Sequence, residues 1–247
     1  MLQIIIMSGA IQRQLPAATP PTQTAPSVLG SALTAQKQTE GTATYTATPA
    51  SAAAGATVLS WVGVRTALFA GPPTGNNGNA HTELFSQAYG NGFTDYSLRG
   101  YRCYSAAGGS NHSVTGSKSS ATDEEATIAA LVLSGGTVVS GGVVRRVANG
   151  AGATLTSGIA TTTGPALLVA SASGDGNVNA TAPTQTWPTG DGWTVHRSVA
   201  FGSADAPNGH IPLYIATKEV AAAGDYTVGV QMTINEGATI SLHAVQI

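Results

Sequence analysis

Short runs in which apolar residues alternate with small or polar ones constrain this chain more than any other feature. They recur along most of its length, and the clearest lie near the end, at 194–199, 226–230 and 238–245. Successive side chains of a strand point to opposite faces of its sheet, so a period of two is typical of half-buried β-strands. Turns of glycine and other small residues separate the runs, as at 222–225. The pattern predicts an all-β chain.

The alternating runs form two similar series. Residues 44–66 and 155–174 each contain a Thr-rich strand, small residues that end in a glycine, and then an apolar strand. Residues 104–133 and 214–245 each contain a Tyr-bearing strand, a small-residue turn that ends in a glycine, an alternating strand, and an apolar strand that begins Ala-Thr-Ile. This parallel predicts an internal pseudo-repeat. Convergence between Ala-, Thr- and Gly-rich strands is the alternative explanation.

The spacing of matching glycines supports the repeat. Gly55 and Gly164 lie 109 residues apart, and Gly108 and Gly224 lie 116 residues apart. The repeat also bears on residues 123–133, where acidic residues after Thr122 suit the first turn of a helix. We expect a strand there, because the equivalent residues of the second series alternate.

Two arrangements of the halves fit this pattern. They form tandem sandwiches, or they interleave in one jelly-roll-like sandwich. We predict a single jelly-roll-like antiparallel β-sandwich over residues 28–247, built from halves at about 41–135 and 152–247. No linker-like segment separates the halves, and the valine-rich connection predicts further strands.

Residues 1–27 differ from the rest and predict an extended N-terminal arm. The first seven residues are apolar except for Gln3, and Leu2, Ile4, Ile5 and Ile6 make them prone to form a strand. The Pro- and Thr-rich run that follows is typical of an extended linker. A tethered apolar tip suits strand addition to a neighbouring subunit. The alternative is an edge strand in the chain's own sheet.

Charge narrows the classes of function. Only 9% of residues are charged and the net charge is −2, against about 25% charged residues in average globular proteins. A chain this neutral either functions within an assembly or has a surface rich in hydroxyl groups. Nothing in its charge favours nucleic acid or an anionic membrane. No run approaches the roughly 18 apolar residues of a membrane span, and no basic segment precedes the apolar N-terminus as in a secretory signal. The lone Cys103 excludes an intrachain disulfide and is expected to be a half-buried apolar residue.

No catalytic constellation is apparent, so we expect a protein that is not an enzyme and holds no cofactor or metal. The five histidines are scattered, and we expect each to face solvent or to be barely buried. Trp61 is expected in the core and Trp193 at an end of the sandwich. Trp187, before a proline in a loop, is the best candidate for contact with a glycan.

Three runs carry a resemblance to a known family. They are 104–109 with its following Thr/Ser strand, 161–170, and 192–195 with the later 220–228. Over about residues 41–247 the chain resembles β-sandwich domains of tailed-bacteriophage virion structural proteins and of some bacterial surface proteins. The motifs mark turns and buried strands, and the resemblance carries over no catalytic residue.

The resemblance implies a structural role on the surface of a virion. We expect a capsid decoration, cement or fibre-head protein that docks through its arm on the major capsid protein or another virion protein. It also implies self-association, with trimers expected. The alternative function is a carbohydrate-binding module of a receptor-binding or secreted protein.

Overall fold

The computed structural model describes most of the chain as strands. It describes residues 23–36, 43–52, 54–89, 96–104, 106–120, 126–146, 153–174, 185–186, 191–199, 212–232 and 237–247. In these ranges the only helical elements are two 3₁₀ turns, Thr66–Leu68 and Asn76–Gly78. Every pairing among the described strands is antiparallel, as expected for an antiparallel sandwich.

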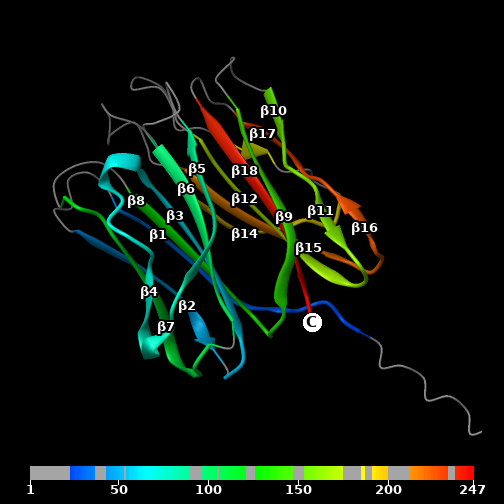
Figure 1. The fold of residues 1–247 in the computed structure, drawn as a ribbon, viewed down its shortest axis with the longest axis horizontal. Coiled ribbons are helices and arrows are strands. Elements are labelled where there is room, and N and C mark those ends of the chain that lie inside the picture. Colours follow the sequence, from blue (N-terminus) through cyan, green and yellow to red (C-terminus); the bar gives the residue numbers. More distant parts are fainter. Residues whose placement is uncertain are drawn as a thin grey trace, which may run out of the picture.

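The first half forms one large and one small sheet. Its strands are β1 (Val28–Gln36), β2 (Thr44–Ala52), β3 (Thr57–Arg65), β4 (Thr74–Gly75), β5 (Thr82–Tyr89), β6 (Tyr96–Cys103), β7 (Gly109–Ser117) and β8 (Ala126–Leu133). The large sheet has the order β1-β8-β3-β6-β5, and the small one has the order β2-β7-β4. Figure 1 shows this half at the left, coloured blue to green.

The second half repeats this plan. Its strands are β9 (Thr137–Arg146), β10 (Ala153–Thr156), β11 (Ala160–Thr162), β12 (Ala166–Gly174), β13 (Gln185–Thr186), β14 (Thr194–Val199), β15 (Leu213–Val220), β16 (Gly224–Tyr226), β17 (Gly229–Met232) and β18 (Ala238–Gln246). The large sheet has the order β9-β18-β12-β15-β14, read from the β9 edge. The small layer consists of β10-β17-β13 and the pair β11-β16.

The two strand orders establish the internal repeat. Strands β1, β8, β3, β6 and β5 correspond in order to β9, β18, β12, β15 and β14. Strand β1 of the first half contacts β14 of the second, and β5 of the first half contacts β9 of the second. Because β9 is the counterpart of β1, and β14 the counterpart of β5, the two large sheets face each other in a reciprocal, two-fold-like manner.

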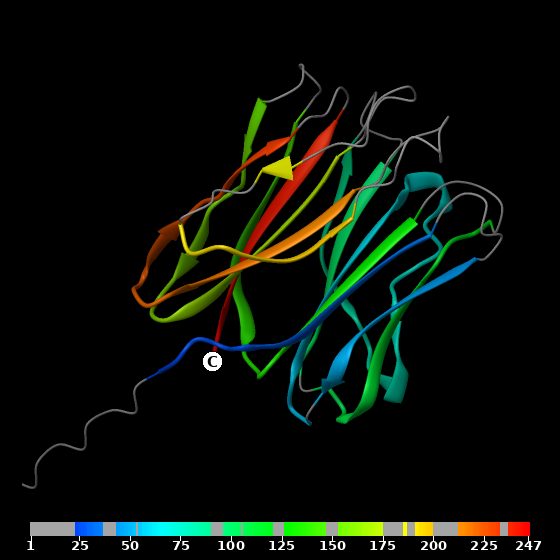
Figure 2. The ribbon, with the colours of Figure 1, turned by 180° about the vertical axis from the view of Figure 1, so that it is seen from behind.

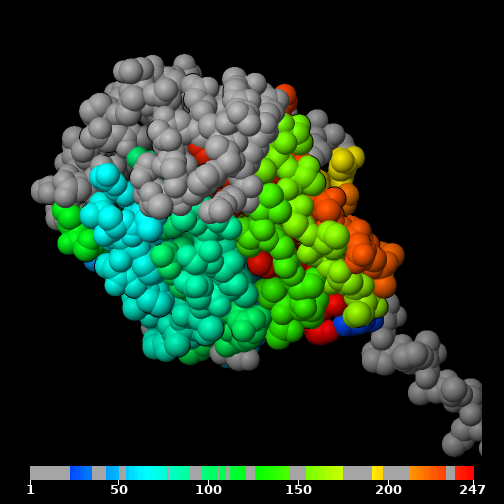
Figure 3. Space-filling view, turned by 45° about the horizontal axis from the view of Figure 1, so that its top comes forward, coloured from blue at the N-terminus to red at the C-terminus, as the bar shows by residue number. Residues whose placement is uncertain are grey.

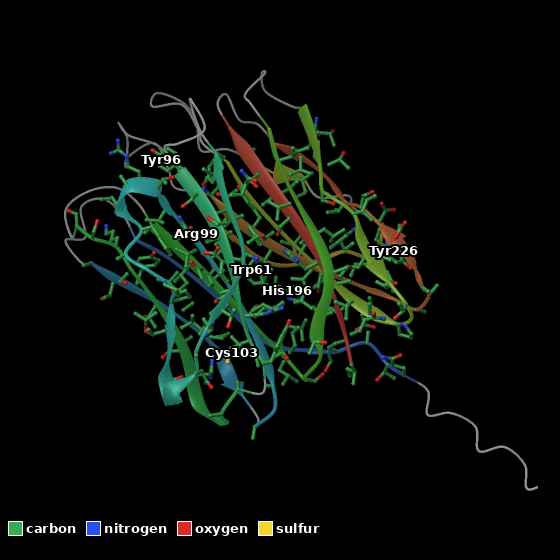
Figure 4. The ribbon with its side chains drawn as sticks, viewed as in Figure 1. Trp61, Tyr96, Arg99, Cys103, His196 and Tyr226 are labelled. Atoms are coloured by element: carbon green, nitrogen blue, oxygen red, sulfur yellow. The ribbon has the colours of Figure 1, made fainter. Side chains whose placement is uncertain are left out.

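Three apolar clusters hold the four layers together. Val58 and Ile128 belong to the core between the two sheets of the first half, and Leu168 and Ile240 to the equivalent core of the second half. The third cluster, which we call the junction core, lies between the two large sheets. Its members are Leu59, Trp61, Tyr89, Tyr96, Leu98, Ala129, Leu131, Leu133, Leu167, Val169, Leu213, Ile215 and Val245. Figure 4 shows Trp61 in the middle of the molecule, between the two halves.

The junction core explains the longest apolar runs of the sequence. Every residue of β8, β12 and β18 is buried, because one face of each strand packs within its own half and the other on the opposite half. A strand buried on both faces needs an almost continuous apolar run, not a strict alternation. The strand at β8 confirms the β prediction for 128–133.

The halves keep their strands separate. The sequence predicted one sandwich over residues 28–247, whereas in the described strands each half pairs only with itself and has its own core. The two layered units then share the junction core. The jelly-roll description stays a prediction.

Two local features depart from regular strands and loops. Strand β2 continues through Pro49 to Ala52, with irregular register around the proline. Proline has no backbone N–H to donate to a neighbouring strand. It is therefore tolerated where the pairing is irregular and that hydrogen bond is not needed. The loop at 71–79 contains a two-residue strand, β4, which pairs with β7.

The connection between the halves is short and tightly clamped. A Cβ on Gly136, whose φ is +90°, would lie 2.8 Å from Pro26 Cγ and 2.9 Å from the carbonyl oxygen of Gln246. The hydroxyl of Thr57 donates to the carbonyl of Gly136 at 2.5 Å, and the backbone N–H of Val138 donates to the hydroxyl of Tyr104 at 2.9 Å. Both halves and both terminal segments therefore meet at this turn.

Candidate functional site

A recess opens where β1 of the first half passes over β14 and β15 of the second. Its volume is about 470 Å³, and its lining comes from Ser27, Val28, Leu167, Gly192, Thr194, His196, Thr217, Lys218 and Glu219. Figure 2 shows the two strands that flank it, blue β1 beside yellow β14. Because Ser27 and Val28 belong to the first half, the recess exists only in the assembled pair of halves.

The lining of the recess is mixed in chemistry. His196 Nε2 lies 2.6 Å from the hydroxyl of Thr217, a hydrogen bond between the two strands of this sheet edge. Thr217 is buried, whereas the Glu219 side chain is exposed. Apolar surface comes from Val28 and Leu167, both in contact with the junction core. A ligand here would meet both hydrogen-bonding and aliphatic groups.

Strand β14 lies at the end of its sheet, beside the recess. Its only strand partner among the described residues is β15, and a bulge lies between Val195 and Arg197. Val195 is 47% exposed and lies on the side of the sheet away from the recess, opposite Ala216.

The segment before β1 is fixed against both halves. The backbone N–H of Ser27 donates to the Ser134 hydroxyl at 2.9 Å, and the Ser134 N–H donates to the Ser27 carbonyl at 2.9 Å. Pro26 packs on Gly136, and the Gln23 side-chain amide donates to the carbonyl of Ile247. The space-filling view shows this blue segment beside the red C-terminal end (Figure 3). Gln23 to Ser27 therefore belong to the folded body.

A second polar group lies inside the core of the first half. Ser60 Oγ is 3.1 Å from His81 Nδ1, and both residues are buried. Burial, with the charge of His112 as a smaller cause, lowers the pKa of His81 to about 4. Burial also lowers the pKa of His112, which is 0% exposed. At neutral pH both imidazoles are uncharged.

The Ser60–His81 contact resembles part of a nucleophile–base pair, but its surroundings do not suit one. A working pair needs a third group that orients the histidine and an opening for the substrate. Neither requirement is met by the described residues around Ser60, where the small sheet of the first half covers the pair. We interpret it as a structural contact in the core.

The structure corrects the histidine prediction. His81, His112 and His243 are buried, at 8%, 0% and 6% exposure, although each was expected to face solvent or to be barely buried. His243 occupies a polar position of β18, but that face is covered by the opposite half, where its ring stacks on Phe85. His196 is half-buried, and His210 lies outside the described residues.

The structure describes some of the predicted site residues but not others. Leu2, Ile4, Ile5, Ile6 and Trp187 lie outside the described residues. Trp61 is 1% exposed, as expected for a core residue, and Trp193 packs against the core of the second half. Cys103 is buried at 7% exposure, and burial raises the pKa of its thiol.

The recess was missed by sequence analysis because it is built from distant segments. Ser27 and Glu219 are separated by most of the chain, and no local motif marks either. In the part of the chain that the structure describes, no three His, Cys, Asp or Glu side chains are grouped to hold a metal ion. No helix in the same residues has the length and apolarity to cross a membrane.

Comparisons of the chain with protein-family models, with curated proteins and with solved structures give no match.

Proposed function

We propose that this protein is a non-enzymatic structural component of a phage virion, a capsid decoration, cement or fibre-head protein that docks through residues 1–22. The observation that carries the proposal is the clamp at the base of the arm. Gln23, Pro26 and Ser27 are tied to the C-terminus and to both halves. Because the base of the arm is fixed to both halves, a partner that binds the arm would hold the whole folded body.

The composition agrees with such a role. With 9% charged residues, the chain has few of the groups that keep a free protein dispersed. The proposal includes a place on the particle surface, a capsid or other virion protein as partner, and self-association with trimers expected. The finer description of the fold as jelly-roll-like belongs to it as well.

The alternative function, carbohydrate binding, finds little support in the described tryptophans. Trp61 is enclosed in the junction core, and Trp193 is partly buried against the second core. Stacking on a sugar ring needs an open aromatic face. That alternative would use Trp187 or a partly exposed tyrosine such as Tyr226.

The test is incorporation into particles. The full chain and a variant without residues 1–22 are produced during particle assembly, and particles are isolated by density gradient and analysed by quantitative mass spectrometry. We expect the full chain in the particles, and the shortened chain folded but absent from them. Circular dichroism spectra that match would show that the body is intact, since Gln23–Ser27 are retained. Equal incorporation of both chains, or none of the full chain, would contradict the proposal.

A control variant separates the arm's tip from its length. Replacing Ile4, Ile5 and Ile6 by serine keeps the tether but removes the apolar tip. We expect it to behave as the deletion does. If it is incorporated normally while the deletion is not, the Pro-rich tether makes the contact.

A further inference from the structure

We propose that His81 and His112 bind a divalent transition-metal ion inside the first half. His81 lies directly before β5 and His112 lies on β7, so the site is between the large and the small sheet of that half. It uses neither the arm nor the recess, and it is therefore independent of the proposed function.

The strand register gives core positions of the first half a counterpart in the second. Val62 pairs with Ile128 in the first half as Ala172 pairs with Ile240 in the second, and both isoleucines end an Ala-Thr-Ile motif of the repeat. The strands β5 and β14 also carry a bulge at the same place in their pairing with β6 and β15. The two cores can therefore be compared residue by residue.

Four buried polar residues of the first half have apolar counterparts in the second half. The equivalent pairs, with the first half named first, are Ser60 and Ala170, Tyr101 and Ala216, His81 and Trp193, and His112 and Val228. The apolar four all belong to the core of the second half or pack against it. The same layered unit therefore forms without polar side chains at these positions. Because burial of a polar group without a partner costs free energy, the polar four point to a role other than folding.

The two histidines carry buried ring nitrogens that can bind an ion. His81 Nε2 and both ring nitrogens of His112 have no hydrogen-bond partner among the described residues. The other nitrogen of His81, Nδ1, lies 3.1 Å from Ser60 Oγ. When Nδ1 carries the proton and donates it to Ser60, Nε2 presents its lone pair to the site.

The backbone of Gly75 leaves space beside His81 Nε2. A Cβ on Gly75 would lie 3.2 Å from that nitrogen. Gly75 pairs with Val114 on β7, and His112 lies two residues before Val114 on the same buried face of that strand. The charge of His112 is also close enough to lower the pKa of His81. The two histidines therefore reach the same part of the core from different elements.

Two neutral imidazoles suit a divalent transition-metal ion. Burial lowers the pKa of both histidines, so at pH 7 they are in the uncharged form that binds metals. Imidazole suits zinc, copper and nickel ions, whereas calcium and magnesium ions prefer oxygen ligands. In the described part of the chain no third His, Cys, Asp or Glu side chain joins them. Water would complete the coordination, so we expect micromolar affinity.

Calorimetric titration of the full chain with Zn²⁺ alone tests the site. We expect binding of one ion per chain at neutral pH. The variants His81→Trp and His112→Val install the residues that the second half has at these positions, so each is expected to keep the fold, as circular dichroism would show. Each should weaken Zn²⁺ binding roughly tenfold or more. No binding by the full chain, or equal binding by the full chain and both variants, would overturn the proposal.

Gly75→Ala tests the geometry with both histidines in place. The φ of Gly75 is −90°, which alanine adopts readily, so the main change is the methyl group beside His81 Nε2. We expect Zn²⁺ binding to weaken roughly tenfold or more. His196→Ala, at the half-buried histidine of the second half, is the control and should bind as the unmodified chain does. Unchanged binding in Gly75→Ala, or loss of binding in His196→Ala, would overturn the proposal.

Electron paramagnetic resonance with Cu²⁺ in place of Zn²⁺ identifies the ligands. The spectrum of the full chain should show coupling of the copper to two imidazole nitrogens. Any Cu²⁺ that remains bound in His81→Trp or His112→Val should show coupling to one. A spectrum of the full chain with oxygen ligands alone, or one that neither variant changes, would overturn the proposal.

Discussion

Phe85 and His243 stack across the junction between the two halves, with ring centroids 5.3 Å apart and planes inclined by 17°. Phe85 lies on β5 and His243 on β18, so each ring comes from a different half. Burial lowers the pKa of His243 to about 4. Its Nε2 has no hydrogen-bond partner among the described residues. The neutral imidazole is thus part of the apolar contact between the halves.

We predict that the free energy of unfolding falls as pH is lowered from 6.5 to about 4. In this window the unfolded chain binds protons at His81 and His243, whose pKa values of about 4 keep them neutral in the folded state. Each group contributes a loss on the order of 3 kcal/mol. Urea titrations at several pH values provide the measurement. His243→Phe, which keeps a ring on Phe85, should remove the share of the pH dependence that His243 contributes, and an unchanged pH profile would exclude His243 as a source.

A second prediction concerns the clamp between the halves. Gly136→Ala should cost about 3 kcal/mol or more, because its Cβ would meet Pro26 and the backbone of Gln246 at a positive φ. Gly55→Ala is the control, since its φ is +87° but no atom lies within 4 Å of the added Cβ. It should cost only the strain of about 1–2 kcal/mol. Thermal melts of both variants measure the difference, and equal losses would mean that the clamp is loosely packed.

A third prediction isolates one hydrogen bond of the junction. The hydroxyl of Tyr89 lies 2.7 Å from that of Ser173 in the opposite half, and both are buried. Tyr89→Phe should cost about 1–3 kcal/mol, because Ser173 loses a buried partner. Tyr45→Phe should cost little or stabilise, since the buried Tyr45 hydroxyl has no partner in the described part of the chain. A double-mutant cycle with Ser173→Ala checks that the Tyr89 effect comes from this bond, and additive losses would rule it out.

A fourth prediction uses two neighbours on β8. Leu131 faces the junction core and Val132 the core of the first half. Leu131→Ala should cost about 2–5 kcal/mol and speed amide exchange in β12 of the other half. Val132→Ala should speed exchange mainly within the first half. Hydrogen exchange with mass spectrometry distinguishes these results, and the same exchange pattern in both variants would mean that the halves do not unfold separately.

Much of the fold could be predicted from sequence because each strand is a local pattern. The turn glycines Gly55 and Gly164 located the repeat, and the alternation located most strands. It was harder to predict which face of each strand packs into the core of its own half. Val58 lies three residues after Gly55, but its counterpart in the second core, Leu168, lies four after Gly164. A shift of one residue exchanges the two faces of a strand, so the glycine spacing alone assigns them wrongly.

The candidate site was less predictable because it depends on how the halves meet. On β8 both faces are apolar, so the sequence does not distinguish the face that packs within a half from the face at the junction. The polar alternation of β18 suggested exposure for His243, and only the opposite sheet buries it. The recess between Ser27 and Glu219 follows from the same contact.

The duplicated body carries a single arm, and this has a consequence for assembly. The halves are related in a two-fold-like manner, but only the first is preceded by an apolar tip. Self-association through this one arm, as proposed, would join two different surfaces, which is a heterologous, head-to-tail contact. Repetition of such a contact closes into a ring when the rotation between neighbours divides a full turn. Any other rotation produces an open helical filament.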